Sequence, residues 1–508
     1  MLVSLSACRN SPGKEANNTS VPTEAATDKP AAPSAVPTEE PTAEPTAEPT
    51  EEPEITPAPT EVPDTEPIDP EHRALRIYSG GGQRFAVMSD GSLWGWGRNQ
   101  YGQVGNGANE FVSFPVPVAE GLTPVIVGET VFALSPDGNL WGWGRNDGGD
   151  LGLGDTADRS KPEAILPFVK EVTRYHDGWY ALTESGDLYK WGFNPWDTSI
   201  SEEQKTAACT PTVVFRDVSF FDGQYLITRS GVLYRRFGEE YVKAADKIKN
   251  VWHDAWAAVV EGKNGRLYEL DPANGMHEIC TSFRSVTVSD GTAYVLMKDG
   301  ALYSYCINGE GGILGASEDK IRRLIFIMDG VEEFYAGDQM GEDWGYYYRF
   351  ALKKNGELWS WGLYDNAMLG MSEESISTDP ALVATDVETV SPNGYNTCVI
   401  KKDGTLWVTG NDTLFGPRYS DECESFGFVM VPFEAKIISV FNFLRIDYYD
   451  DEEDFTDWVE LCAATYIIDE NGRIWAWGWN GDGLLGVLSN EDEVSSPMPV
   501  VKLMNTED

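Results

Sequence analysis

The stretch of sequence that decides the fold is AVMSDGSLWGWG, residues 86–97. Asp-Gly between two apolar runs is a strong signal for a β-hairpin, because the type I′ turn that it favours needs positive φ angles, which glycine adopts without strain. We therefore predict two antiparallel strands that are joined at Gly91.

This pattern returns nine times beyond residue 75, at a mean spacing of roughly 48 residues, a period typical of repeat architectures. The second residue after each turn glycine is Leu or Ile, and the third is Trp or Tyr. Adjacent apolar residues place bulk on both faces of a strand, so each sheet should be covered on both sides. The turn glycines are Gly91, Gly138, Gly186, Gly231, Gly265, Gly300, Gly356, Gly404 and Gly472.

These features predict an all-β fold, a β-propeller of four-stranded antiparallel blades. Radial stacking of such blades buries both faces of every sheet and leaves only short edges. A helical solenoid is excluded by the turn chemistry and by the lack of a 3.6-residue period. The nine repeats leave the number of blades open between seven and nine.

Three segments resemble the regulator of chromosome condensation repeat. They are WGRNQYGQVG at 96–105, WGRNDGGDLG at 143–152 and WGWNGDGLLG at 477–486. The resemblance covers roughly residues 75–502 and implies a propeller, usually of seven blades. The repeats at Gly231 and Gly265 lack the Trp-Gly tail. Members of this family are mostly recognition platforms, and the founding activity is nucleotide exchange on a small GTPase.

The first 71 residues have a different composition. They hold 14 of the 29 prolines and few residues that could pack in a core, so we predict a disordered linker at 9–71. The stretch LSAC before it resembles a bacterial lipobox, in which Cys8 is lipidated after cleavage. A complete signal also carries a basic start and an apolar run, so either the true start lies upstream of Met1 or the likeness is accidental. We expect a truncated lipoprotein signal at 1–8, the linker, and the propeller at 72–508.

The formal net charge is −44, and residues 72–508 alone carry 67 acidic and 35 basic side chains, a net charge of −32. This charge repels nucleic-acid phosphates and anionic lipids and attracts basic partners, and it also favours solubility. We therefore expect no nucleic-acid partner, and contact with the membrane only through a lipid anchor.

The sequence shows no recognisable catalytic or metal motif. The four His residues have no metal-ligand spacing, and no G-x-S-x-G sequence occurs. Carboxylates are too abundant for a glycosidase pair to be singled out. We expect no enzyme activity and no cofactor, and the acidic stretch 447–457 lacks the ligand spacing of an EF-hand.

Two insertions separate the first and second strands in the seventh and ninth repeats, and both mix aromatic residues with carboxylates. Since both fall in the same loop of their blade, they should lie on the same face of the propeller, where aromatic residues suit a binding hot spot. The alternative is two solvated loops that cover blade edges. The candidate partner-binding residues are Trp344, Tyr346, Tyr347, Tyr448, Tyr449 and Trp458.

We therefore predict a non-catalytic, monomeric protein-binding module that is extracellular and lipid-anchored to a bacterial cell membrane. Its partner is a protein, and the charge favours a basic one. The alternatives are an exchange regulator of a small GTPase, as in the founding family member, and a propeller enzyme that acts on glycans. The identity of the partner is not encoded in any motif that we recognise.

Overall fold

The computed structural model describes residues 73–238, 240–271, 275–307, 322–340, 345–363, 368–371, 377–392, 396–410, 425–449, 458–489 and 493–500. The chain divides into two units, Met1–Thr56 and Pro57–Asp508, and all described residues belong to the second. Cys8 and the predicted linker therefore lie outside the described residues. In the described part of the chain, no helix has the length and apolar character needed to cross a membrane.

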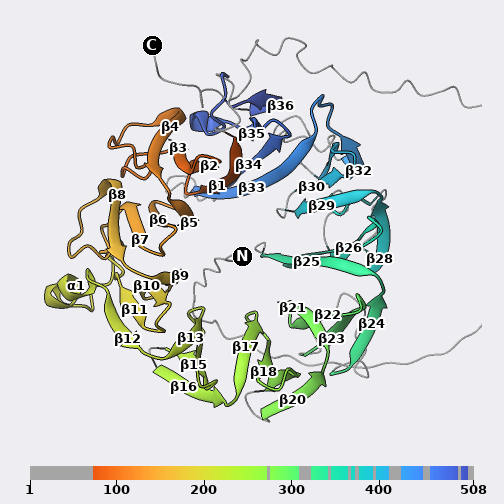
Figure 1. The fold of residues 1–508 in the computed structure, drawn as a ribbon, viewed down its shortest axis with the longest axis horizontal. Coiled ribbons are helices and arrows are strands. Elements are labelled where there is room, and N and C mark those ends of the chain that lie inside the picture. Colours follow the sequence, from red (N-terminus) through yellow and green to blue (C-terminus); the bar gives the residue numbers. More distant parts are fainter. Residues whose placement is uncertain are drawn as a thin grey trace, which may run out of the picture. The chain divides into compact units, whose positions relative to one another are not determined.

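The described residues form nine four-stranded antiparallel sheets arranged in a ring (Figure 1). Each sheet takes four strands that are consecutive in the chain, so each predicted repeat contributes to a blade. The two repeats without the Trp-Gly tail also form complete blades, the fourth and the fifth. The chain therefore differs from the seven blades that are usual in the family it resembles.

The blades are numbered in chain order, and each runs from its first to its fourth strand. Blades 1 to 3 consist of β1 (Ala74–Gly80), β2 (Gln83–Met88), β3 (Ser92–Gly97), β4 (Val112–Glu120); β5 (Thr123–Ile126), β6 (Thr130–Leu134), β7 (Leu140–Gly144), β8 (Arg159–Leu166); and β9 (Val169–Tyr175), β10 (Gly178–Thr183), β11 (Leu188–Trp191), β12 (Thr212–Phe215). Blades 4 to 6 consist of β13 (Val218–Phe221), β14 (Tyr225–Thr228), β15 (Leu233–Phe237), β16 (Glu240–Ala245); β17 (Ile248–His253), β18 (Ala258–Gly262), β19 (Leu267–Asp271), β20 (Gly275–Cys280); and β21 (Phe283–Ser289), β22 (Thr292–Met297), β23 (Leu302–Cys306), β24 (Leu324–Met328). Blades 7 to 9 consist of β25 (Val331–Met340), β26 (Gly345–Lys353), β27 (Leu358–Leu363), β28 (Ser377–Ala384); β29 (Val387–Pro392), β30 (Asn396–Lys401), β31 (Leu406–Gly410), β32 (Ser425–Met430); and β33 (Ile437–Tyr449), β34 (Trp458–Asp469), β35 (Ile474–Trp479), β36 (Glu493–Pro499). One α-helix, α1 (Glu202–Ala208), lies between β11 and β12, and the short 3-10 helix η2 (Gly481–Gly483) follows β35.

The turn that defines the repeat is a hairpin, but not of the predicted type I′. Among the residues that link β2 to β3 only Gly91 has a positive φ, of 85°, whereas a type I′ turn needs positive φ at two residues. The Gly91 N–H donates to the carbonyl of Met88 at 3.0 Å, which leaves a three-residue loop between the strands. This is a type I turn followed by a left-handed glycine in a G1 bulge.

The same glycine joins neighbouring blades. In seven blades its carbonyl accepts a hydrogen bond from the first residue of the next blade, as in Val169 N–H to Gly138 at 2.7 Å. One of these bonds closes the ring, because Ala74 at the start of the first blade donates to Gly472 in the last blade at 3.1 Å. The turn therefore contributes both to its own hairpin and to the contact between blades.

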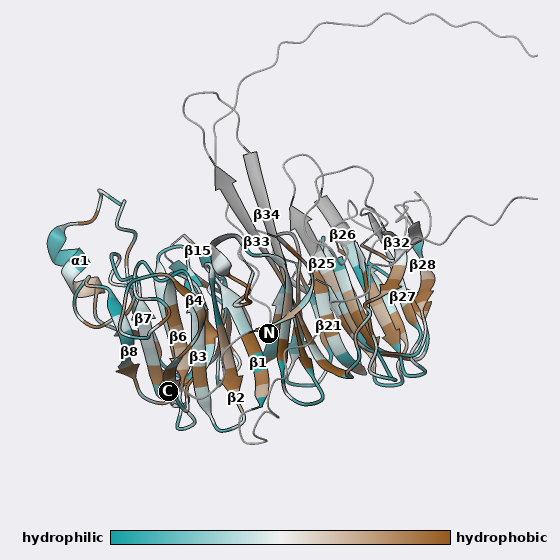
Figure 2. Cartoon of the chain, turned by 90° about the horizontal axis from the view of Figure 1, so that it is seen from above, coloured by the Kyte–Doolittle hydropathy of each residue, from teal (hydrophilic) through white to brown (hydrophobic). Residues whose placement is uncertain are grey.

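The apolar columns of the repeat form the core between the blades. Figure 2 shows hydrophobic residues concentrated along the strands and hydrophilic residues at their ends. The Leu residues two positions after the turn glycines are buried, as Leu93 and Leu140 illustrate with no exposed surface. Cys398 also lies in the core and is 1% exposed.

Side-chain packing completes the ring between the ninth and the first blade. Trp96 is fully buried, and its indole N–H donates to the carbonyl of Leu484 at 3.1 Å. The guanidinium group of Arg84 lies 6.0 Å from the ring centre of Tyr466 in β34. Since the two blades exchange no strand, these contacts and the backbone bond to Gly472 hold them together.

The glycine-rich segments after the third strands form hydrogen bonds with the next blade. Trp143 donates its indole N–H to the carbonyl of Gln103 in the preceding loop at 2.9 Å, and Trp191 donates to that of Asp150 at 2.6 Å. Within the first such loop, the Asn99 side chain accepts a hydrogen bond from the Val104 N–H. These backbone groups are therefore used for contacts within the fold.

Candidate functional site

The propeller has two chemically different faces. The turn face carries the turn glycines and the links between blades. The loop face carries the turns between first and second strands and the loops between third and fourth strands, and it is the upper side in Figure 2, where α1 lies. Connections are short and regular on the turn face but vary in length on the loop face.

The seventh-repeat insertion extends the hairpin of the seventh blade towards the loop face. β25 has 10 residues and β26 has 9, whereas the first strands of the seven blades without a long insertion have four to seven. Tyr346 pairs with Gln339 and Tyr347 with Asp338 across this hairpin. The predicted residue Trp344 lies outside the described residues.

The ninth-repeat insertion extends its hairpin further. β33 has 13 residues and β34 has 12, and their pairing reaches Tyr449 opposite Trp458. Tyr448 pairs with Val459. Because the first two strands of every blade join at the loop face, the structure places the backbone of five of the six predicted residues on hairpins that extend to one face.

A charged and aromatic cluster on the loop face joins the third and fourth blades. Arg236 at the end of β15 donates to the Asp177 carboxylate at 2.5 Å and to the Tyr180 hydroxyl at 3.1 Å. Lys190 reaches the same carboxylate at 2.6 Å. The Arg236 guanidinium lies 4.8 Å from the ring centre of Tyr175. This cluster, named here the Arg236 cluster, ties two blades at their loop-face ends.

The electrostatics of the Arg236 cluster follow from this geometry. Burial by itself would raise the pKa of Asp177, but the hydrogen bonds from Arg236 and Lys190 outweigh it and lower the pKa to about 2. Burial and the Asp177 charge raise the pKa of the Tyr180 hydroxyl. At pH 7 the Asp177 carboxylate is therefore ionised, and the Tyr180 hydroxyl is uncharged.

A second arrangement lies at the seam of the fourth and fifth blades. Asp222 accepts from His253 Nε2 at 2.8 Å, with the ring nitrogen protonated. Burial opposes protonation of His253, but its hydrogen bond and charge interaction with Asp222 prevail and raise its pKa. On the same seam, the Arg235 guanidinium lies 5.9 Å from the ring centre of Tyr225 and 5.2 Å from that of Phe237.

Three large aromatic side chains are exposed on the loop face of the third to fifth blades. Trp196, before α1, is 81% exposed, Phe237 is 56% exposed and Trp256 is 66% exposed. Aromatic side chains of this size supply contact area and are enriched at the centres of protein interfaces. The arrangement is suited to binding a macromolecular surface.

These residues do not stand out in the sequence of the repeats. Arg236 and Asp177 come from different repeats, and Arg236 stands five residues after its turn glycine, at a position that Trp occupies in five other repeats. One signal was available, since two successive arginines, Arg235 and Arg236, stand in a third strand of a chain with few cations. Within the described residues, no group of three or more His, Cys, Asp or Glu side chains is placed to hold a metal ion.

Comparison with known proteins agrees with the repeat. Residues 90–127 and 137–179 match the model of the Regulator of chromosome condensation (RCC1) repeat. Yeast RCC1 (Prp20), solved bound to Kap60, is 16% identical over 89% of this chain and 90% of that chain, with a TM-score of 0.40. Human WBSCR16 is 15% identical over 81% and 94%, with a TM-score of 0.39. No curated protein matches the chain in sequence. The chain therefore carries the RCC1 repeat pattern within its first three blades.

Proposed function

We propose that the chain is a non-catalytic, surface-tethered module that binds a protein through the loop face of its propeller. The observation that carries the proposal is the exposure of Trp196, Phe237 and Trp256 on that face. Exposing an aromatic side chain to water is unfavourable in free energy. Three such side chains on one face of adjacent blades are typical of a surface that a partner covers.

The net charge sets the kind of partner and the kinetics of binding. A net charge of −32 over residues 72–508 steers a basic protein towards the propeller, and salt screens this attraction. Solvated carboxylates each contribute little to affinity, whereas buried aromatic anchors contribute more. We expect added salt to slow association and aromatic substitutions to speed dissociation.

The experiment has two stages. The purified protein is first used to capture its partner from the surface of the cells that produce it, and the captured partner is then titrated on immobilised protein. Replacing Trp256 with Ala should weaken binding by about tenfold or more, since loss of one hot-spot side chain costs about 2 kcal/mol. Tyr347→Ala and Tyr448→Ala should speed dissociation, as expected if the two extended hairpins also contact the partner.

The matched control is Phe168→Ala. Phe168 is 60% exposed but lies on the turn face, and its φ of 56° is equally unusual for Ala and Phe, so the substitution removes an exposed aromatic ring without new backbone strain. The proposal requires that this variant binds as the parent does. If Phe168→Ala weakens binding and the loop-face variants do not, the turn face is the site and the proposal fails.

The tether is tested separately. When it is expressed behind a complete lipoprotein signal, the protein should partition into detergent, and Cys8→Ser should release it into the aqueous phase, because stable attachment needs acyl chains on that cysteine. A parent protein that stays in the aqueous phase would exclude lipid anchoring without affecting the proposal for the loop face.

A further inference from the structure

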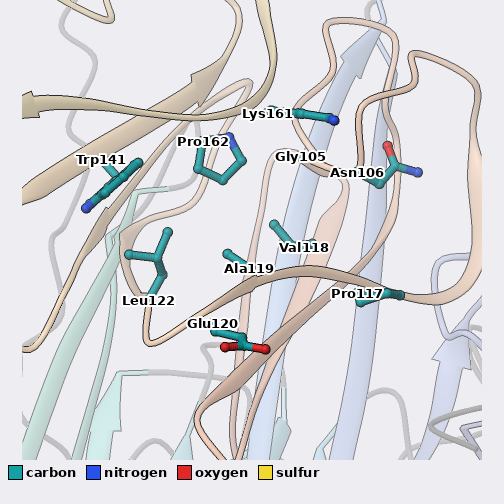
Figure 3. Close-up of a pocket in the computed structure, with 10 residues that line it drawn as sticks. All are labelled: Gly105, Asn106, Pro117, Val118, Ala119, Glu120, Leu122, Trp141, Lys161 and Pro162. Carbon is teal, nitrogen blue, oxygen red and sulfur yellow. The ribbon is translucent and has the colours of Figure 1, made fainter. Parts of the chain in front are cut away.

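A depression of about 430 Å³ lies on the outer wall of the propeller, at the seam between the first and second blades (Figure 3). It is separate from the loop-face aromatics, which lie on the third to fifth blades. Its volume falls in the range of roughly 300–1,000 Å³ that ligand pockets occupy. Its apolar surface comes from Trp141 in β7, Val118 in β4, and Leu122.

The same place in the repeat is hollow at another seam. A depression of about 350 Å³ lies between the seventh and eighth blades. Strand register shows the correspondence. In the first blade Pro117 pairs with Trp94, and in the seventh blade Leu382 pairs with Trp359. Both of these Trp residues stand three positions after their turn glycine. Trp141 in the second blade and Trp407 in the eighth blade hold the same position. The two depressions therefore occupy equivalent places in the repeat, and their lining residues decide what each can bind.

The lining at the first seam differs in charge. Glu120 and Lys161 line it, and the corresponding residues at the other seam are the uncharged Thr385 and Gly427. Both charged side chains belong to exposed residues, and neither makes an ion pair with another residue in the described part of the chain. The seam thus holds two opposite charges that do not neutralise each other.

The Trp ring that lines the depression is also less covered at the first seam, where it belongs to Trp141, than at the other seam, where it belongs to Trp407. At the other seam the Lys401 ammonium group lies 4.0 Å from the ring centre of Trp407 and covers that ring. The position of Lys401 is taken in the second blade by Ser135, whose hydroxyl bonds to Asp137 in its own turn. No cation is found over Trp141 among the described residues, which leaves its ring available to a ligand.

Figure 3 shows that the polar groups are separated along the depression. Lys161 and Asn106 lie at one end and Glu120 lies at the other, with the apolar side chains between them. The Asn106 carbonyl oxygen accepts from Asn99 and from the Ala108 N–H, so its amide N–H groups remain as donors. One end can therefore bind an anion and the other a cation, and the middle can bind an apolar group.

The backbone at the rim favours recognition through side chains. Pro117 and Pro162 stand in β4 and β8, the outermost strands of their blades, and proline has no N–H to donate. A partner strand therefore cannot form a continuous ladder of hydrogen bonds along either edge. We propose that this seam binds an extended peptide segment with a carboxylate side chain at one end, an ammonium or guanidinium side chain at the other, and an apolar residue between them.

The test uses three blocked tetrapeptides with the intact protein in calorimetric titrations. They are acetyl-EPLK-amide, acetyl-KPLE-amide and the uncharged acetyl-QPLQ-amide. The parent should bind one of the two charged peptides at least about threefold more tightly than the uncharged one, since two solvent-exposed ion pairs together contribute about that factor. Equal affinity for all three, or no binding at millimolar concentration, would overturn the proposal.

A charge-exchange variant makes the test specific. Glu120→Lys combined with Lys161→Glu keeps the net charge and the size of the site but reverses its polarity, so the preference between the two charged peptides should reverse. The control exchange is Lys243→Glu with Asp246→Lys, an exposed ion pair at the outer strand of the fourth blade, which should leave the preference unchanged. An unaltered preference in the Glu120 and Lys161 variant, with circular dichroism equal to the parent, would contradict the assignment. This outcome is independent of binding at the loop face.

Discussion

Replacing Asp177 with Asn tests whether the Arg236 cluster stabilises the propeller. The Arg236 side chain is only 6% exposed and depends on the Asp177 carboxylate for its ion pair, at 2.5 Å. Asn retains one hydrogen-bond acceptor but removes the negative charge. The substitution therefore isolates the electrostatic part of the contact between the third and fourth blades.

The magnitude follows from the pKa of Asp177. Folding lowers it from the ordinary 3.8 to about 2. Such a difference corresponds to about 2 kcal/mol of stability at neutral pH, and the 25% exposure of the carboxylate makes this an upper value. Because the folded pKa is depressed, the contribution is fully present above about pH 4 and is lost as the pH falls towards 2.

Urea unfolding followed by tryptophan fluorescence measures the effect. The free energy of unfolding of Asp177→Asn should be about 2 kcal/mol below that of the parent at pH 7, and about half of that deficit should remain at pH 3. The control is Asp246→Asn, which breaks an ion pair whose two side chains are 54% and 57% exposed, and it should change stability by less than about 0.5 kcal/mol. A deficit that is absent at pH 7, or that is as large at pH 3 as at pH 7, would refute the electrostatic reasoning.

Three further changes test other parts of the fold. Gly138→Val should cost more than about 1 kcal/mol, because Gly138 has a φ of 80° and a β-branched residue is strained there; an unchanged melting temperature would contradict this. Trp96→Phe should cost about 1 kcal/mol or more by removing the bond to Leu484 that helps to close the ring, as measured by thermal unfolding. The pKa of His253 is raised by Asp222, so the contribution of this ion pair to stability is present below about pH 6.5 and is lost as the pH rises through the folded pKa. His253→Gln should therefore destabilise the protein more at pH 5.5 than at pH 8. Equal losses of stability at both pH values would count against the ion pair.

The repeated part of the fold could be predicted from the sequence because it depends on local chemistry. Each hairpin is identified by its turn glycine and by the apolar residues two and three positions after it. Because these residues lie on both faces of the sheet, both faces must be buried against neighbouring sheets. The turn type was wrong, because it depends on the φ of the residue before the glycine, which Asp and Asn leave open. The number of blades was open, because nothing in a single repeat fixes how many copies close a ring.

The candidate site was harder to predict because its residues do not share a position in the repeat. Asp177 lies in a turn of the third blade and Arg236 in a strand of the fourth, 59 residues later. They meet only because adjacent blades align their loop-face ends. The charged seam at Glu120 and Lys161 has the same origin, since its two sides belong to neighbouring blades and only the register of their outer strands brings them together.

The two faces of the propeller differ in how much the contacts between blades depend on them. On the turn face, seven glycine carbonyls bind the next blade in the same way, so most substitutions there disturb contacts between blades. On the loop face, connections range from the short turn at Gly223 to the long segment that contains α1, and the strands beneath them remain regular. A new side chain on this face can therefore change a binding surface at little cost to the ring. This asymmetry supports the proposal that a partner binds at the loop face, where the exposed Trp196, Phe237 and Trp256 are found.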